Sequence, residues 1–360
     1  MKIGKRFLSL DFTLLASSVA ISGLGVLSIY SSTGPETALR QAVFVIFGLG
    51  IYFLLSFFDW RLLKESSFLV LLVYLFFVGL LASLLAFGPE IRNVQRWFRV
   101  GPVTVAPAEL AKLALIILLA KYFSARHVEL YKIRHIILSG IYAFIPTYLV
   151  FRQPDMGTAI IFLVLWGGIL LISGIKLKHF AVLSGLALSS FGAAWSFLMK
   201  DYQKDRIISF VNPQFDPQGI GWGSNHARIA VGNGGFFGRG LGQGTQTQYG
   251  FLPEPHTDFI FAAIAEEMGF IVVLLLIFLL GVVAWRILKI IFNSEYNFAR
   301  LYASGFLIIF IFQSFVNIGM NLGILPIMGT PLPFVSYGGS SAVLFFAGLG
   351  ILESIRYNNI

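Results

Sequence analysis

The sequence predicts an all-α polytopic membrane protein with about ten transmembrane helices and a large external loop between spans 7 and 8. Its 360 residues are 57% hydrophobic and only 12% charged, whereas a soluble domain carries about 25% charged residues. The apolar residues form runs of roughly 17–25 residues, the length that a helix needs to cross a bilayer. The chain has no cysteine, which excludes disulfides and thiolate chemistry.

Ten candidate spans follow one another, at residues 11–30, 38–58, 67–87, 108–124, 135–151, 157–173, 180–199, 262–285, 301–325 and 335–355. The first is expected to be retained, because it is too long for the apolar part of a signal peptide and lacks a clear A-x-A cleavage site. Residues 1–360 are expected to form one integral membrane domain, whose external loop covers about residues 200–261.

The distribution of Lys and Arg predicts the orientation. The short connections at 31–37 and 326–334 contain neither residue, whereas the alternate connections are basic. Their basic residues are Lys2, Lys5, Arg6, Arg61, Lys64, Arg126, Lys132, Arg134, Lys176, Lys178, Arg286, Lys289, Arg300 and Arg356. Because cytoplasmic loops carry the excess of Lys and Arg, both termini are expected to be cytoplasmic.

Two segments on the predicted outer side are basic against this rule. The long loop holds Lys200, Lys204, Arg206, Arg228 and Arg239, but long loops cross a membrane largely regardless of charge. The short segment 88–107 is more informative, and it holds Arg92, Arg96 and Arg99. These three arginines either contact lipid headgroups or bind an anionic ligand.

The long loop also contains a glycine-rich stretch, VGNGGFFGRGLGQGTQTQYG, from Val231 to Gly250. Closely spaced glycines permit positive φ and close approach of the backbone to a neighbour. The stretch lacks the G-K-[ST] ending of a Walker A loop. Two interpretations stay open, a re-entrant surface loop and a cradle for phosphate or sugar.

Seven ionisable residues lie within predicted spans or at their mouths, namely Arg40, Glu109, Lys112, Asp155, Asp258, Glu266 and Glu267. Such groups cost roughly 2.5–3.5 kcal/mol each on insertion and are functional candidates by default. Glu109 and Lys112 are three residues apart and can pair on one helix face, either within a site or as an internal salt bridge.

Asp155 and Asp258 each precede a predicted span. Either could serve only as a helix N-cap, for which Asp is a favoured residue, or could belong to a site. His256, close to Asp258, is either a base or a surface histidine. No spacing of His and acidic residues specifies a metal site, although external carboxylates can hold a divalent cation.

These residues share the outer side with a segment of unusual composition, GTPLPFVSYGGSS at 329–341. Its prolines and paired glycines interrupt apolar runs, which is tolerated in a membrane only where protein or water satisfies the backbone. One cavity open to the outer leaflet would collect Asp155, Asp258 and the external arginines. Acidic groups beside basic ones suit a phosphorylated lipid whose neighbour must lose a proton.

Five ordered motifs resemble the SEDS family, and its RodA branch more than its FtsW branch. They are NVQRWFRVG, QPDMGTA, IAVGNGGFFGRGLGQGTQ, FLPEPHTDFIFAAIAEEMGF and NIGMNLGILPIMGTPLPFVSYGGSS, and the match extends from about residue 88 onward. The resemblance implies a ten-span peptidoglycan glycosyltransferase that polymerises lipid II into β-1,4 glycan strands on the outer face of the bacterial inner membrane, for elongation and shape. It also implies a complex with a class B penicillin-binding protein. Membrane lipids are expected contacts, and nucleic acid is not.

The resemblance places the family's essential aspartate at Asp258. It places other family residues at Trp97, Glu109, Lys112 and Asp155. The chain departs from the family where Ala106 and Ala108 replace polar residues and where His226 and Ala227 replace Gln and Ser. Arg239 keeps the charge of a lysine that the family carries in the glycine-rich stretch.

On this resemblance Asp258 is the general base for the acceptor hydroxyl in a single inverting displacement. The diphosphate leaving group needs positive charge, for which the candidates are Lys112, Arg206 and Arg239, with Glu109 orienting Lys112. Mg²⁺ or Mn²⁺ is a candidate cofactor, and no organic cofactor is expected. A lipid II flippase is the alternative that intramembrane charges and interrupted helices also suit; a non-catalytic scaffold for the transpeptidase would not need those charges.

Overall fold

The computed structural model describes residues 10–89, 95–101, 103–126, 133–197, 199, 201–212, 216, 218–219 and 221–358. Within these residues ten long helices each overlap one predicted span, which confirms the all-α polytopic fold. They are α2 Phe12–Thr33, α3 Pro35–Phe57, α5 Ser67–Phe87, α6 Pro107–Ser124, α7 Ile133–Arg152, α8 Met156–Ile172, α9 Leu177–Phe197, α13 Ile260–Asn293, α14 Asn297–Asn321 and α15 Gly339–Asn358.

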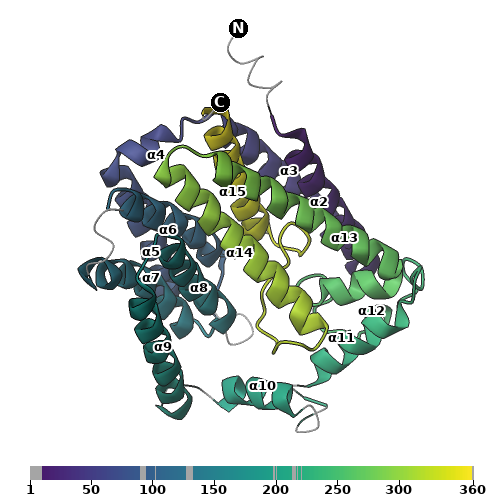
Figure 1. Cartoon of the computed structure of the whole chain (residues 1–360). Helices are drawn as coiled ribbons and strands as arrows, with labels where there is room; N and C mark the ends of the chain where they lie inside the picture. Colours follow the sequence, from purple (N-terminus) through teal and green to yellow (C-terminus); the bar gives the residue numbers. More distant parts are fainter. Residues whose placement is uncertain are drawn as a thin grey trace.

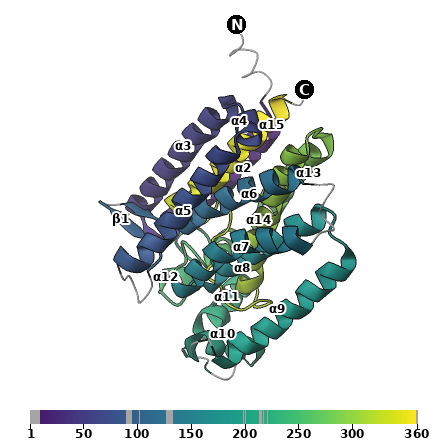
Figure 2. The ribbon, with the colours of Figure 1, turned by 90° about the vertical axis from the view of Figure 1, so that its left-hand side faces the viewer.

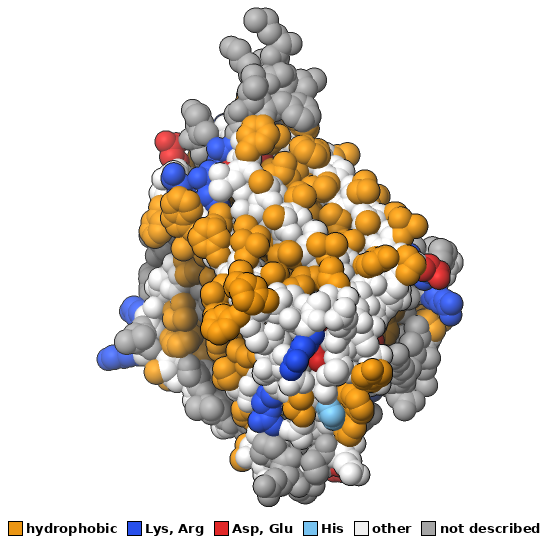
Figure 3. Space-filling model, turned by 90° about the vertical axis from the view of Figure 1, so that its right-hand side faces the viewer, with side chains coloured by type: hydrophobic (Ala, Val, Ile, Leu, Met, Phe, Trp, Pro, Cys, Tyr) orange, Lys and Arg blue, Asp and Glu red, His pale blue; other side chains and the backbone are white. Residues whose placement is uncertain are grey.

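Membrane-crossing character is clear for most of these helices. Seven are long and apolar enough to cross a membrane, and α8 is apolar but shorter. Helix α6 carries Glu109, Lys112 and Lys121, and these charges lower its apolar character. The count of ten spans therefore stays a prediction. On the face drawn in Figure 3, hydrophobic side chains form a broad apolar surface, and charged side chains lie at its edges.

The helices form one bundle around α14 and α15. Most of each of these two helices is buried, whereas α3 and α5 leave most of their surface exposed. Helix α14 contacts α6, α8 and α13, and α15 contacts α3. Both chain ends lie at one end of the bundle, and α10 (Asp201–Val211) lies at the opposite end, as Figures 1 and 2 show. This arrangement agrees with termini on one side of a membrane and the long loop on the other.

The external segments contain structure that the sequence analysis did not predict. The long loop holds three helices, α10, α11 (Trp222–Asn233) and α12 (Thr245–Gln248). Segment 88–107 contains an antiparallel hairpin of β1 (Phe98–Val100) and β2 (Val103–Val105). A further short helix, α4 (Arg61–Glu65), connects α3 to α5. The hairpin brings the residues before it next to the start of α6.

Helix α13 is broken at Gly269, where the sequence analysis expected a continuous span. Gly269 has φ 82° and ψ 177°. A Cβ atom on Gly269 would lie 2.2 Å from the nitrogen of Gly238, and one on Gly238 would lie 2.2 Å from the oxygen of Glu267. The glycines are needed because two backbones touch here.

The glycine-rich stretch supplies the hydrogen bonds that the break in α13 leaves open. The N–H of Arg239 donates to the carbonyl of Glu266 at 2.9 Å, and that of Gly240 donates to Glu267 at 3.0 Å. In return the N–H of Phe270 donates to the carbonyl of Gly235 at 2.9 Å. Broken helices need such partners inside a membrane protein. The stretch is therefore a loop docked on α13, and the described lining of the outer cavity contains none of its residues.

Candidate active site

A cavity of about 150 Å³ lies where the hairpin, α6, α8 and the start of α13 meet. Four of the predicted site residues line it, namely Trp97, Glu109, Asp155 and Asp258. The segment before α15 contributes Gly329, Pro331, Tyr337 and Gly338, and the first turn of α15 contributes Gly339, Ser340 and Ser341. The structure thus brings together side chains from positions 97 to 341, as the sequence analysis expected for a single outer cavity.

Asp258 stands on the turn that leads into α13. The N-cap residue of α13 is Phe259, so the position of the cap falls one residue after Asp258. The turn is fastened from two sides: Ser336 Oγ donates to the carbonyl of Thr257 at 2.7 Å, and the N–H of Tyr337 donates to that of His256 at 2.8 Å. The carboxylate of Asp258 belongs to the cavity lining.

Asp155 combines the two roles that the sequence left open. It is the N-cap of α8, and its Oδ1 accepts a hydrogen bond from the N–H of Thr158 at 3.1 Å. Its Oδ2 accepts from the Thr158 hydroxyl at 2.9 Å and lies 3.5 Å from Nε of Arg96. The cap fixes the carboxylate, and the carboxylate in turn orients a cavity arginine.

Arg96, one of the external arginines that the sequence analysis expected in this cavity, lines it, although it was not among the candidates named for the diphosphate. Its Nη2 donates to the carbonyl of Pro154 at 2.8 Å, and its side chain is 20% exposed. A Cβ atom on Gly329 would lie 3.8 Å from Arg96 Nη1 and 3.6 Å from Asp258 Oδ2. The guanidinium and the Asp258 carboxylate therefore converge on the same glycine. The motif QRW, which places Arg96 beside Trp97, was the available signal.

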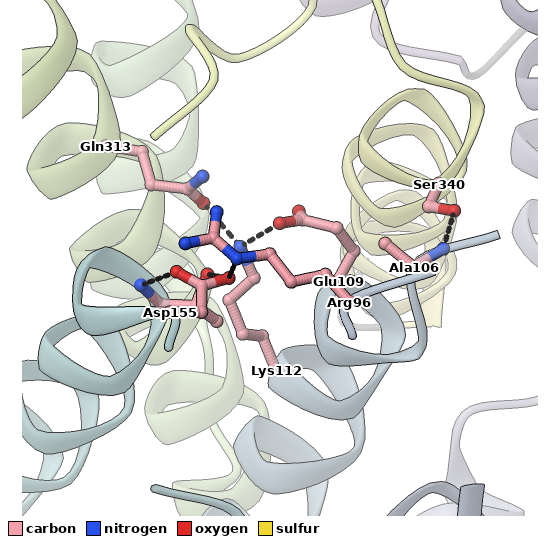
Figure 4. Close-up of polar contacts among 8 residues, drawn as sticks. Arg96, Ala106, Glu109, Lys112, Asp155, Gln313 and Ser340 are labelled. Carbon is pink, nitrogen blue, oxygen red and sulfur yellow. Dashed lines mark hydrogen bonds and ion pairs between the residues drawn. The ribbon is translucent and has the colours of Figure 1, made fainter. Parts of the chain in front are cut away.

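Glu109 and Lys112 form the ion pair that their spacing predicted. Lys112 Nζ donates to Glu109 Oε1 at 2.8 Å and to Gln313 Oε1 at 3.3 Å. Lys112 has no exposed surface and is not part of the cavity lining, whereas Glu109 is. Figure 4 shows Glu109 and Lys112 of α6 with Arg96 and Asp155, which come from two other segments, and the four side chains are directed toward one another. The lysine thus lies behind the glutamate and holds it.

The buried Oε2 atom of Glu109 has no hydrogen-bond partner among the described residues. It is a free acceptor on the carboxylate whose other oxygen is held by Lys112. Beside Glu109, Ala106 and Ala108 form part of the lining, and the N–H of Ala106 donates to Ser340 Oγ at 2.8 Å. Two of the departures from the family pattern, Ala106 and Ala108, therefore fall on the cavity wall.

One of the predicted diphosphate contacts, Arg239, is not brought to the cavity. It is exposed, and its Nε donates to the carbonyl of Asn233 at 2.8 Å. Arg206 belongs to α10, and its side chain lies outside the described part of the structure. Some of the basic residues that predicted the membrane orientation or an anion site lie outside the described residues. They are Lys2, Lys5, Arg6, Arg92, Lys132 and Lys200.

The remaining ionisable residues have structural partners elsewhere. Glu266 is buried and accepts hydrogen bonds from the N–H groups of Gln246 and Thr247 at 2.8 and 2.9 Å, which ties α12 to α13. Glu267 accepts from Gln248 Nε2 at 2.7 Å. Arg40 pairs with Glu36 on an exposed face of α3. None of these residues belongs to the described cavity lining.

A metal site formed by protein side chains alone does not fit the described part of the chain. In those residues no group of three or more His, Cys, Asp or Glu side chains is placed to hold an ion. Two of the cavity carboxylates, Asp155 and Glu109, are instead paired with Arg96 and Lys112.

The apolar helical bundle and its cavity define the class, a polytopic membrane protein with a charged pocket between its helices. The family model FTSW_RODA_SPOVE, described as "Cell cycle protein", matches residues 7–360. The chain belongs to this family.

Individual relatives agree with this assignment. The chain is 36% identical over 349 residues to peptidoglycan glycosyltransferase MrdB of Escherichia coli (strain K12), covering 96% of this chain and 93% of MrdB. It is similar to a chain of the structure called "Structural coordination of polymerization and crosslinking by a peptidoglycan synthase complex", with TM-score 0.85, 32% identity and coverage of 98% and 99%. Rod shape determining protein RodA of Thermus thermophilus is similar with TM-score 0.73, 30% identity and 98% coverage of both chains.

Proposed function

We propose that the chain is a peptidoglycan glycosyltransferase that polymerises lipid II into β-1,4 glycan strands for cell elongation and shape. The observation that carries the proposal is the convergence of the Asp258 carboxylate and the Arg96 guanidinium on Gly329, within one cavity. A base and a cation side by side are what transfer of a sugar from a diphosphate requires. The name of MrdB and the name of the peptidoglycan synthase complex support the same activity.

In the proposed reaction Asp258 takes the proton of the acceptor 4-hydroxyl. The acceptor oxygen forms a bond to the anomeric carbon of the donor while the bond from that carbon to the diphosphate oxygen breaks. The diphosphate leaves with the electron pair, and its charge is balanced by Arg96. Because the attack is in line and single, an α-linked donor yields a β-linked product. Positioning of the two sugars supplies much of the acceleration.

Lys112 is proposed to act indirectly, by holding the Glu109 carboxylate, because the lysine is fully buried behind it. Glu109 lines the cavity, and its Oε2 has no hydrogen-bond partner among the described residues, so Glu109 is proposed to orient a sugar hydroxyl or amide. Asp155 orients Arg96. Trp97 lines the cavity beside them and is proposed to contact a sugar face. Binding of the diphosphate by Arg206 or Arg239 stays a prediction, because neither residue belongs to the described lining.

A divalent cation, Mg²⁺ or Mn²⁺, remains a proposal of the sequence analysis. Mg²⁺ is commonly held by one or two carboxylates together with substrate phosphates, so the ion would reach this cavity with the diphosphate. Polymerisation by protein treated with a chelator and then supplied with each ion tests it. Activity that survives chelation unchanged would remove the cation from the account.

We further propose that the protein lies in the bacterial inner membrane with both termini cytoplasmic and that a class B penicillin-binding protein docks on it. An apolar groove of about 490 Å³ runs between α8, α13 and α14, and its lining includes Val164, Leu288, Ile291, Ile308 and Ile311. A single transmembrane helix would pack there by van der Waals contact. The external loop would supply further contacts, and docking is expected to raise the polymerisation rate.

Purified protein supplied with lipid II tests the activity, with the products separated on a gel. The proposal expects a ladder of glycan polymer that lengthens with time. A flippase would instead move lipid II across the bilayer of a liposome and form no polymer. A scaffold would do neither, and its only effect would be on the transpeptidase. Absence of polymer, with or without the partner protein, contradicts the proposed function.

A further inference from the structure

Two buried asparagines of α14 meet at the backbone of Asp258. Asn317 and Asn321 have no exposed surface, and they are four residues apart, so they share one helix face. Nδ2 of Asn317 donates to the carbonyl oxygen of Asp258 at 3.1 Å, and Nδ2 of Asn321 donates to the same oxygen at 3.0 Å. One carbonyl thus receives two side-chain amides from a neighbouring helix.

Each amide also holds a second segment. Nδ2 of Asn317 donates to the carbonyl of Thr330, in the segment before α15, at 2.8 Å. Nδ2 of Asn321 donates to the carbonyl of Asn317 at 2.8 Å, and its Oδ1 accepts from the N–H of Ala262 at 3.1 Å. The pair therefore joins the Asp258 turn, the first turn of α13 and the cavity wall at one point.

The bond to Ala262 replaces a local helix cap. The first N–H groups of a helix have no partner within the helix and are usually satisfied by the N-cap side chain. The N-cap residue of α13 is Phe259, which has no side-chain acceptor. Asn321 satisfies one of these N–H groups from another helix. Asn321 thus ties the first turn of α13 to the same point at which it holds the carbonyl of Asp258, a residue of the cavity lining.

We infer that Asn317 and Asn321 are positioning residues that fix the carboxylate of Asp258 in the cavity. The inference rests on the proposed role of Asp258 as the base. A carbonyl held by two amides fixes the turn on which the carboxylate is carried, and a misplacement of about 1 Å can cost about 100-fold in rate. A purely structural role would hold α14 against α13 and would affect the amount of folded protein, not the turnover of each folded molecule.

The test compares Asn317→Ala and Asn321→Ala with Ser314→Ala as a matched control. Ser314 is a buried residue of the same helix whose hydroxyl donates to the carbonyl of Phe310, one turn earlier in α14, at 2.8 Å. Polymerisation of lipid II is measured as kcat and KM, well below the thermal midpoint of each purified protein. Each Asn variant is expected to lose about 10- to 100-fold in kcat with KM within about threefold, and the control is expected to keep the parent's kcat.

Two comparisons sharpen the test. Asn317→Ala removes one donor to the Asp258 carbonyl but leaves the bond from the Ala262 N–H to Asn321 in place, so it is expected to fold and to lose kcat. This variant decides the question if Asn321→Ala does not fold. The double variant Asn317→Ala with Asn321→Ala is expected to lose much less than the product of the single losses, because both amides act on one carbonyl.

Unchanged kcat in the Asn variants would overturn the inference, as would a loss that follows only the fraction of folded protein, or a rise in KM at constant kcat. These outcomes leave the proposed function intact if Asp258→Asn forms no polymer. If Asp258→Asn polymerises normally, the base assignment fails, and with it the reason for the asparagine pair.

Discussion

Nζ of Lys112 lies 2.8 Å from Oε1 of Glu109, and only the glutamate of this pair reaches the cavity. Gln313 of α14 completes the surroundings of the lysine, with its Oε1 at 3.3 Å. The positive charge of Lys112 is therefore matched inside the bundle. A diphosphate in the cavity would meet Arg96 and Glu109 before it could meet Lys112.

This pairing predicts how stability responds to substitution. Lys112→Met alone leaves the Glu109 carboxylate buried without its cation, which is expected to cost about 3–5 kcal/mol of unfolding free energy. Adding Glu109→Gln removes the unpaired charge and should recover most of that loss. Thermal unfolding of the purified proteins in detergent measures both effects. A single variant as stable as the parent would contradict the pairing.

Arg96 is expected to matter more for turnover than for folding. Arg96→Ala removes the cation proposed to balance the leaving diphosphate, and loss of one such group typically costs about 10²–10³ in kcat. Arg96→Lys should recover only part, because an ammonium cannot keep the contacts with both Asp155 and Pro154. Arg99→Ala is the control, since Arg99 is exposed on β1 and opposite Thr104. Equal losses from Arg96 and Arg99 would point to a general charge effect on lipid binding.

The break in α13 offers a comparison of two glycines in one helix. Gly269→Ala places a Cβ at φ 82° and 2.2 Å from the Gly238 nitrogen, so it is expected to displace the glycine-rich loop and to destabilise the protein by more than about 1 kcal/mol. Gly281→Ala meets no atom within 4 Å and should be neutral or stabilising by up to about 1 kcal/mol. Thermal unfolding and protease cleavage of the loop report both. Tolerance of Gly269→Ala would show that the docked loop is not needed.

Helix positions and cavity membership could be predicted because both are local in the sequence. Apolar runs mark the helices, and motifs such as QPD and HTD mark the ends where Asp155 and Asp258 stand. The burial of Lys112 could not be read in this way, because it depends on Gln313, about 200 residues away along the chain. The break at Gly269 depends in the same way on Gly238.

Other features of the structure have local signals in the sequence. Alternating residues on either side of a Gly-Pro pair, FRVGPVTV, are typical of a hairpin. Two asparagines four residues apart in an apolar helix, NIGMN, are polar groups at membrane depth and hence functional candidates. What they bind could not be predicted, because the carbonyl of Asp258 lies about 60 residues earlier in the chain.

The orientation in the membrane can be tested by labelling, since the chain has no native cysteine. Gln246 is a poor site because its side chain is half-buried and contacts His226 at 2.6 Å. Tyr249, in the same loop, is 75% exposed. Tyr249→Cys is expected to react with an impermeant thiol reagent in intact cells. Reaction only after lysis would reverse the proposed orientation.

The role of Asp258 is tested most directly by replacing its carboxylate with an amide. Asp258→Asn keeps the size of the side chain and the backbone carbonyl that Asn317 and Asn321 hold, but an amide cannot accept the proton. Loss of a general base typically costs 10²–10⁴-fold, or about 3–5 kcal/mol of barrier. Asp258→Glu should retain little activity, because it moves the carboxylate by about 1 Å.

The decisive measurement is therefore polymer formed from lipid II by purified Asp258→Asn, beside the parent and with the folded state of both verified by thermal unfolding. The proposed mechanism predicts a folded, membrane-inserted protein that forms no detectable polymer. A variant that polymerises within a few-fold of the parent would remove Asp258 from the chemistry and would make Asp155 the next carboxylate to test.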